Sequence, residues 1–206
     1  MRVTTTADRD ASLPPGLRER SKAKRRALIV RTAMQLFAER GYTHTTVADI
    51  ADAAELAPRT VAGYFPTKID IATAYADDLA ARLTATFHTQ PDADVLHVLD
   101  LWLTAEADHL EPETARLAVA MYHENPGLAA LGRGRLAAAT TVFSDAIAAY
   151  LGVPNDHPTA TITMSTFAAA LGAYINAIVE HEPTRELHDW LINFLRAMLG
   201  STPNLV

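Results

Sequence analysis

The sequence has no cysteine and no long apolar run, and signals typical of β-strands are scarce in it. Without cysteine, the chain forms no disulfide and no thiolate metal site. The longest apolar stretch, residues 167–179, carries Asn176 and is too short to cross a bilayer. The start of the chain is polar and charged, unlike a secretory signal sequence. We therefore expect a soluble, cytoplasmic protein that does not contact a membrane.

Motifs of catalysis and metal binding are also missing. The chain has 8 histidines, but His97 and His109 are too far apart to share a helical turn, and no HExxH spacing occurs. No P-loop, dinucleotide fingerprint or nucleophile elbow is present. We expect no enzyme, no catalytic residue, no metal and no cofactor; a helical enzyme that carries a basic arm is the rival interpretation.

Alanine and leucine dominate the 206 residues, and their spacing favours helices. The length suits a small domain joined to a larger one. We expect an all-α fold with residues 1–16 as a flexible arm. Residues 17–67 form a small helical domain in this division, and residues 68–206 form a larger helical domain.

The net charge of −6 hides an asymmetry between the two parts of the chain. Residues 1–68 contain 12 Lys and Arg against 7 Asp and Glu, whereas residues 69–206 contain 6 against 17. The front therefore carries +5 and the remainder −11. A basic front on an acidic body indicates a polyanionic partner for the front alone. The alternative is a solvated basic tail.

The stretch from Thr45 to Lys68 has the pattern of two short helices joined by a tight turn. The first helix has one apolar face, formed by Val47, Ile50, Ala51 and Ala54. Thr46 can cap this helix through its hydroxyl, and Pro58 suits the first position of the second helix. Thr67 then caps a longer helix that begins at Lys68. A helix, a short turn and a second helix form the unit that places its second helix in a DNA major groove.

A basic helix precedes this unit. Its basic start contains Arg18, Arg20, Lys22, Lys24, Arg25 and Arg26, and its apolar stripe contains Ile29, Ala33, Leu36 and Phe37. Gly41 follows it, at the usual place for a left-handed cap residue. This helix is expected to bury its stripe and to offer its basic start to solvent or phosphate.

The run from Ala27 to Ala72 resembles the N-terminal DNA-binding domain of TetR-type transcriptional regulators. The matching residues are Leu36-Phe37, Gly41-Tyr42, Thr46-Val47, Ile50-Ala51, Thr60, Tyr64-Phe65 and Lys68. They cover roughly residues 20–72, about a quarter of the chain, and are specific in combination. The opening Ala57-Pro58-Arg59-Thr60 resembles the subgroup with a Ser-Pro-Arg-Thr recognition helix.

The resemblance implies a double-stranded DNA operator as partner. The implied DNA-binding residues are Lys24, Thr46, Ala57, Pro58, Arg59, Thr60, Gly63, Tyr64 and Lys68. Thr46 would bind a phosphate, Arg59 and Thr60 would reach base edges, and Tyr64 and Lys68 would hold the DNA backbone. If Arg59 contacts a base, guanine is expected, because its O6 and N7 accept a bidentate fork. A phosphate contact by Arg59 and a core position for Tyr64 are the alternatives.

Two positions depart from the family pattern. Glu55 stands at the turn, where the family often has glycine, and a left-handed conformation there costs a non-glycine residue about 1 kcal/mol. Ala62-Gly63 replaces a pair that usually holds an aromatic and a polar or basic residue. Base preference and affinity are therefore expected to differ from the family pattern.

Beyond Ile71 the resemblance is architectural. It implies a pocket for a small-molecule effector in the larger domain, for which we select Trp102, Met121, Tyr122 and Phe143 as lining residues. An ordinary core position is the alternative for each of them. A ligand there would shift the helix from Lys68 to Thr89 and release the DNA.

The last two helices resemble the family's four-helix interface between two subunits. The residues that we expect on this homodimer face are Ala169, Gly172, Ala173, Asn176, Trp190, Leu191 and Phe194. Packing within one monomer is the alternative. The sequence as a whole predicts a one-component DNA-binding regulator, most simply a repressor released from a palindromic operator by a small apolar ligand. An activator of the same fold and a ligand-binding protein with degenerate DNA binding are the alternatives.

Overall fold

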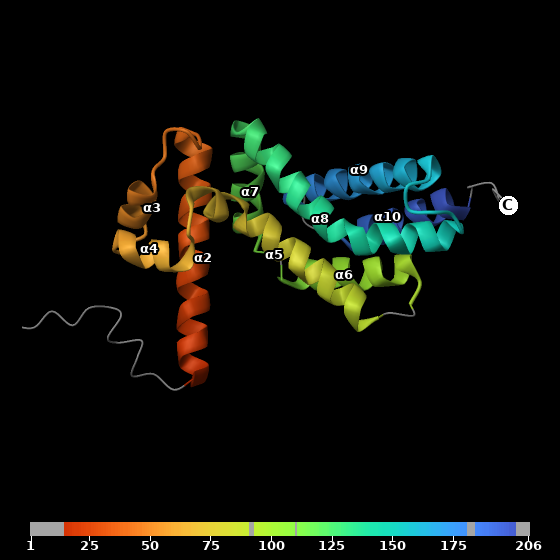
Figure 1. Cartoon of the computed structure of the whole chain (residues 1–206), viewed down its shortest axis with the longest axis horizontal. Helices are drawn as coiled ribbons and strands as arrows, with labels where there is room; N and C mark the ends of the chain where they lie inside the picture. Colours follow the sequence, from red (N-terminus) through yellow and green to blue (C-terminus); the bar gives the residue numbers. More distant parts are fainter. Residues whose placement is uncertain (1–14, 91–92, 110, 181–183, 201–206) are drawn as a thin grey trace, which may run out of the picture.

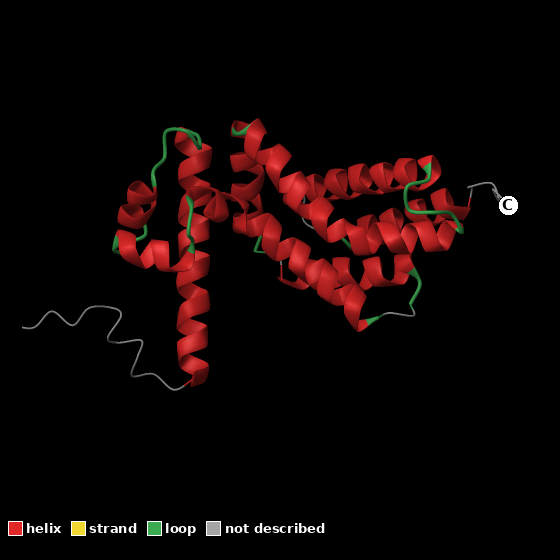
Figure 2. Ribbon diagram, viewed as in Figure 1, coloured by secondary structure: helices red, strands yellow, loops and turns green. Residues whose placement is uncertain are grey.

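The computed structural model describes residues 15–90, 93–109, 111–180 and 184–200, and these residues form only helices and loops (Figure 2). The helices are α2 (Pro15–Arg40), α3 (Val47–Ala53), α4 (Pro58–Tyr64), α5 (Lys68–Thr89), α6 (Val95–His109), α7 (Pro112–Glu124), α8 (Pro126–Leu151), α9 (Pro158–Glu180) and α10 (Arg185–Gly200). The all-α fold class is confirmed. Residues 1–14 of the expected arm lie outside the described residues, and α2 begins at Pro15, a residue that suits the first turn of a helix.

Helices α2, α3 and α4 form a small domain at one end of the molecule, away from α6, α9 and α10 (Figure 1). The stripe predicted on α2 is buried there: Ile29, Ala33 and Phe37 are 0% exposed and Leu36 is 6% exposed. The same apolar cluster contains Ile50 of α3, Val61 of α4 and Ile71 of α5, and also Met121 of α7 and Leu128 of α8. The core of the small domain therefore continues into the larger one.

The larger core lies among α5, α6, α8, α9 and α10. Helices α5 and α8 pack along each other, and the Phe143 ring lies 5.7 Å from the rings of both Phe87 and Phe167. His188 Nε2 of α10 lies 2.6 Å from Asp100 Oδ1 of α6, which holds the last helix on the body. Among the described residues, no helix combines the length and apolarity that a membrane crossing requires.

Ion pairs join α2 to the helices of the body. Arg26 donates two hydrogen bonds to the carboxylate of Asp78 on α5, at 2.5 and 2.9 Å. Arg31 Nη2 lies 2.6 Å from Glu113 Oε2 on α7. These side chains are partly exposed, so each pair stabilises the fold only weakly. Their positions nevertheless specify how α2 meets α5 and α7.

Asn125 lies between α7 and α8 and binds the end of α2. Its side-chain amide donates hydrogen bonds to the carbonyls of Phe37 and Met121, both at 2.8 Å, and its Oδ1 accepts one from the Tyr42 N–H at 2.6 Å. Gly41 lies between Phe37 and Tyr42 with a φ of +80°, which confirms the expected left-handed cap. One side chain therefore fixes the turn after α2 to the body.

Candidate nucleic-acid interface

Local hydrogen bonds build the start of α3. The Thr46 hydroxyl accepts a hydrogen bond from the Asp49 N–H at 3.1 Å, and the Asp49 carboxylate accepts one from the Thr46 N–H at 2.7 Å. This reciprocal capping box confirms Thr46 as the cap of α3. The side-chain and backbone hydrogen bonds from Thr46 lower the pKa of Asp49. A second capping box, between Thr67 and Asp70, confirms the predicted start of α5.

The turn between α3 and α4 contains a strained residue. Glu55 has a φ of +54°, and no other non-glycine residue in the described part of the chain has a positive φ. The expected cost of about 1 kcal/mol therefore applies. The Glu55 N–H donates to the Asp52 carbonyl at 3.0 Å, and the Leu56 N–H donates to the Ala51 carbonyl at 2.8 Å. This turn leads to α4, which begins at Pro58 as predicted.

Helix α4 packs through one side and exposes the other. Val61 is 0% exposed, and Phe65 directly after the helix is 6% exposed. The predicted DNA-contact residues Ala57, Pro58, Arg59 and Gly63 are exposed, whereas Thr60 and Tyr64 are half-buried. Tyr64 packs against the core of the small domain, in line with its core alternative. The exposed side has no acidic residue, and a DNA major groove is wide enough to admit an α-helix.

Lys68 has partners within the chain that the sequence did not indicate, and the cap partner of Thr46 occupies the groups predicted to bind a phosphate. Lys68 Nζ donates to the carbonyls of Tyr42 at 2.8 Å and Thr45 at 2.9 Å, and it lies 4.0 Å from the centroid of the Tyr42 ring. An ammonium group has three donors, so these carbonyls occupy two of them. The hydroxyl and amide of Thr46 both contact Asp49. A phosphate at Thr46 would have to compete with this carboxylate.

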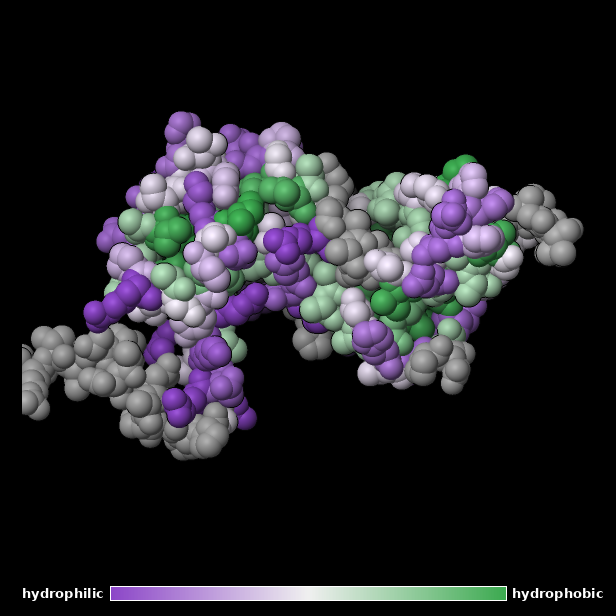
Figure 3. Space-filling view, viewed as in Figure 1, coloured by the Kyte–Doolittle hydropathy of each residue, from purple (hydrophilic) through white to green (hydrophobic). Residues whose placement is uncertain are grey.

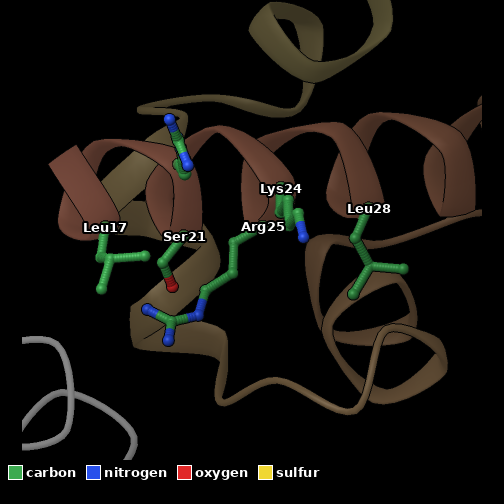
Figure 4. A pocket seen from close by; sticks show the side chains of 6 residues that line it. Leu17, Ser21, Lys24, Arg25 and Leu28 are labelled. Atoms are coloured by element: carbon green, nitrogen blue, oxygen red, sulfur yellow. The ribbon is translucent and has the colours of Figure 1, made fainter. Parts of the chain in front are cut away.

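The N-terminal part of α2 forms a separate basic surface. Lys24 is exposed there, together with Arg18, Arg20 and Lys22. Figure 3 shows hydrophilic residues gathered over this end of α2. One side of the helix carries an open groove of about 480 Å³ lined by Leu17, Arg20, Ser21, Lys24, Arg25 and Leu28 (Figure 4). Lys24 therefore lies on a different helix from Arg59 but within the same basic domain.

The four predicted effector residues fall into two groups. Trp102 and Phe143 lie in the core of the body, whereas Met121 and Tyr122 belong to the cluster of the small domain. The structure does not bring the four together, because α6 and α8 direct Trp102 and Phe143 into the core of the body, whereas α7 directs Met121 and Tyr122 towards the other cluster. Met121 and Phe143, at 0% and 2% exposure, fit the core alternative. Trp102 and Tyr122 differ, since Trp102 Nε1 and Tyr122 Oη are buried without a hydrogen-bond partner in the described structure.

Tyr122 makes the stability of the folded state depend on pH in the alkaline range. Burial, followed by the nearby Tyr75 and Asp77, raises the pKa of Tyr122 from 10.0 to about 12. The unfolded chain therefore loses this proton first, and the folded state loses stability as the pH rises from 10 towards 12. Tyr122→Phe should remove about 2 to 3 kcal/mol of this alkaline loss. It should not destabilise the protein at pH 7, because it also removes an unpartnered buried hydroxyl.

Urea unfolding of the parent and Tyr122→Phe at pH 7, 10 and 11.5 measures this difference. Tyr150→Phe is the matched control, because Tyr150 is 47% exposed. A Tyr122→Phe protein whose stability falls as steeply between pH 10 and 11.5 as that of the parent would contradict the prediction.

The predicted dimer residues are mostly exposed. Ala169, Gly172 and Ala173 are exposed on α9, and Trp190 and Phe194 of α10 are 60% and 39% exposed. The Trp190 and Phe194 rings stack, with centroids 5.3 Å apart and planes at 6°. Leu191 is a correction: it is 2% exposed and packs in the chain's own core, because the apolar stripe of α10 is broad and this part of it faces the body. Asn176 lies in α9, but its side chain is outside the described residues.

Sequence reasoning missed the residues that join the small domain to the body. Asn125 was recognisable only as a cap before Pro126, and its contacts to Phe37 and Tyr42 span 88 and 83 residues. Arg26 belongs to the basic run of α2, yet it pairs with Asp78. No local pattern distinguishes such partners, because each depends on a residue far away in the sequence.

Comparison with known proteins finds a family model that matches the small domain. Residues 29–75 match the model of bacterial regulatory proteins of the tetR family. The chain is 34% identical over 87 residues to the HTH-type transcriptional regulator TcmR of Streptomyces glaucescens, a match that covers 42% of this chain and 38% of that protein. It is 36% identical over 70 residues to the HTH-type transcriptional repressor Rv3405c of Mycobacterium tuberculosis, covering 34% of this chain and 37% of that protein. The chain thus matches less than two fifths of the length of either relative.

Solved structures resemble nearly the whole chain. A transcriptional regulator of the TerR/AcrR family from Aquifex aeolicus VF5 has a TM-score of 0.59 at 16% identity and covers 84% of this chain and 99% of its own. The fatty acid degradation regulator FadR from Bacillus halodurans has a TM-score of 0.59 at 18% identity and covers 87% and 96%. At these identities the likeness shows the fold. The chain therefore has a TetR-type helix-turn-helix domain followed by a larger helical domain, as in structures of that type.

Proposed function

We propose that this chain, whose residues 29–75 match the TetR family, is a one-component transcriptional repressor that binds a palindromic operator as a homodimer. The observation that carries the proposal is the exposed outer side of α4, which centres on Arg59 and has no acidic residue. In this proposal residues 17–67 bind DNA, and residues 68–206 bind a partner subunit and an effector. We propose no catalytic role, since the curated relatives are named as transcriptional regulators.

The DNA contacts divide into base reading and anchoring. Arg59 and Thr60 at the start of α4 reach base edges, with guanine as the base opposite Arg59. Lys24, the remaining donor of Lys68 and the hydroxyl of Tyr64 hold phosphates. We also assign the chain to regulators with a Ser-Pro-Arg-Thr recognition helix, on the Ala57 to Thr60 opening alone.

A second copy of the chain supplies a second recognition helix. One seven-residue helix contacts too few base pairs for specificity, whereas two half-sites about one helical turn apart supply enough contacts. The exposed small residues of α9 and the stacked Trp190–Phe194 pair form an apolar face that a two-fold related copy would cover. Because α9 and α10 lie away from α4, a partner on this face would leave both recognition helices accessible (Figure 1).

A small, largely apolar effector would control release from DNA. The unpartnered Trp102 Nε1 is a donor that a polar atom of such a ligand would satisfy. A displacement of the body would reach α2 through Asn125 and through the Arg26–Asp78 and Arg31–Glu113 pairs. Release requires that the effector binds the released state better than the DNA-bound state.

Fluorescence anisotropy on DNA tests the proposed function. The probes are a labelled fragment from directly upstream of the protein's own gene and a scrambled fragment of equal length, each titrated across a salt series. We expect tight binding to the first only, weakening steeply with salt because several phosphates are contacted. Equal, weak binding to both fragments, and to every duplex of a random-sequence pool, would favour a ligand-binding protein with degenerate DNA binding. An activator of the same fold would bind like a repressor and would differ in a transcription assay.

A further inference from the structure

We propose that Gly63 is a specificity-determining residue that lets the backbone of α4 lie directly against the base-pair edges of double-stranded DNA. The inference rests on the proposed function and deepens it. Arg59 and Gly63 are both exposed, and their separation of four residues places them on one side of the helix, opposite the buried Val61. Position 63 therefore belongs to the surface that would enter the major groove.

The fold itself does not explain a glycine at this position. A Cβ built at Gly63 meets no atom within 4 Å, and its φ lies outside the left-handed region. Three other glycines have an internal reason, since Gly41 and Gly152 have φ values of +80° and +68° and a Cβ at Gly132 would lie 3.0 Å from Tyr122 Oη, whereas Gly127 and Gly172 share the open surroundings of Gly63. Glycine is among the poorest helix formers, so alanine would stabilise α4. The contacts within the monomer therefore give no reason for a glycine at position 63.

Gly172 shows the same combination in α9. It lies inside α9, is exposed, and a Cβ there also meets nothing within 4 Å. It belongs to the face that we propose for the second subunit. In both places a helix lacks a side chain where another surface is expected to approach closely.

DNA is the partner whose chemistry fits the surroundings of Gly63. Its exposed neighbours on α4 are Pro58, Arg59 and Ala62, which give one positive charge, no negative charge and little bulk. A helix without a side chain at this position of its exposed side can lie deeper in the major groove, which brings Arg59 within reach of guanine and the Ala62 methyl within reach of a thymine methyl. The pair Ala62-Gly63 would then change which bases the protein prefers, and it would not abolish sequence-specific binding.

Gly63→Ala separates this role from a structural one. Gly127→Ala is the matched control, because a Cβ at Gly127 also meets nothing within 4 Å, and Gly127 lies at the start of α8, far from α4. Both variants should raise the melting temperature, by about 2 to 4 °C, through better helix formation. The probe is the duplex that the wild-type protein enriches most from a random-sequence pool. Gly63→Ala should bind it about 10-fold or more weakly, whereas Gly127→Ala should match the wild type.

The test also uses two further duplexes. Both variants should bind a scrambled duplex like the wild type, and replacing thymine by deoxyuridine in the half-site should weaken wild-type binding at the position that Ala62 contacts. Unchanged affinity of Gly63→Ala for the enriched duplex, or a lowered melting temperature, would overturn the role of Gly63 and leave the proposed function standing. If the wild-type protein enriches no sequence, the role of Gly63 and the proposed function both fail.

Discussion

Arg59→Ala is expected to abolish most of the preference for operator over scrambled DNA. Arg59 is exposed near the start of α4, and it has no ion pair among the described residues, in contrast to Arg26 and Arg31. A bidentate arginine–guanine contact contributes about 1 to 3 kcal/mol of discrimination. Because the dimer has two such helices, the loss should be about 2 to 6 kcal/mol, or roughly 30-fold to more than 10,000-fold.

Arg59→Lys distinguishes base reading from phosphate binding. Lysine keeps the positive charge but lacks the planar fork, so affinity for scrambled DNA should remain and operator preference should fall. Anisotropy on both duplexes at one salt concentration measures the ratio, with Arg116→Ala on the exposed side of α7 as the control. An equal loss of affinity for both duplexes in Arg59→Ala would show that Arg59 binds a phosphate instead.

Asn125→Ala is expected to lower the free energy of unfolding by about 2 to 3 kcal/mol. The substitution removes three hydrogen bonds at once and leaves the partly buried Tyr42 N–H and Phe37 carbonyl without this partner. Asn125→Asp should be no better, because a carboxylate accepts from the Tyr42 N–H but cannot donate to the carbonyls of Phe37 and Met121.

Urea unfolding followed by circular dichroism measures this loss. Asn193→Ala on the exposed side of α10 is the control and should change the unfolding free energy by less than about 0.5 kcal/mol. If Asn125→Ala unfolds at the same urea concentration as the parent, Asn125 does not fix the turn after α2 to the body.

Features that depend on neighbouring residues were predictable from the sequence. Thr46 and Thr67 cap helices through residues three positions later, Pro58 begins α4, and Gly41 adopts its left-handed conformation. Each of these depends on one turn of the chain, so its physical cause is contained in a short stretch. The strain at Glu55 was predictable for the same reason.

Features that depend on distant residues were not predictable. The carbonyls that bind Lys68 belong to a loop 23 and 26 residues away. The stripe of α10 contains both Leu191, which faces the chain's own core, and Trp190, which faces solvent. Spacing identifies such a stripe as apolar, but the packing of α10 on the body decides which part of it stays exposed.

Selection from a pool of random double-stranded DNA tests the central claim most directly. The wild-type protein, incubated with the pool at moderate salt, should enrich a palindrome with two half-sites about one helical turn apart and a guanine in each half that Arg59→Ala no longer selects. Enrichment of no sequence, or of one that Arg59→Ala selects equally well, would contradict the account of α4 as a DNA reader.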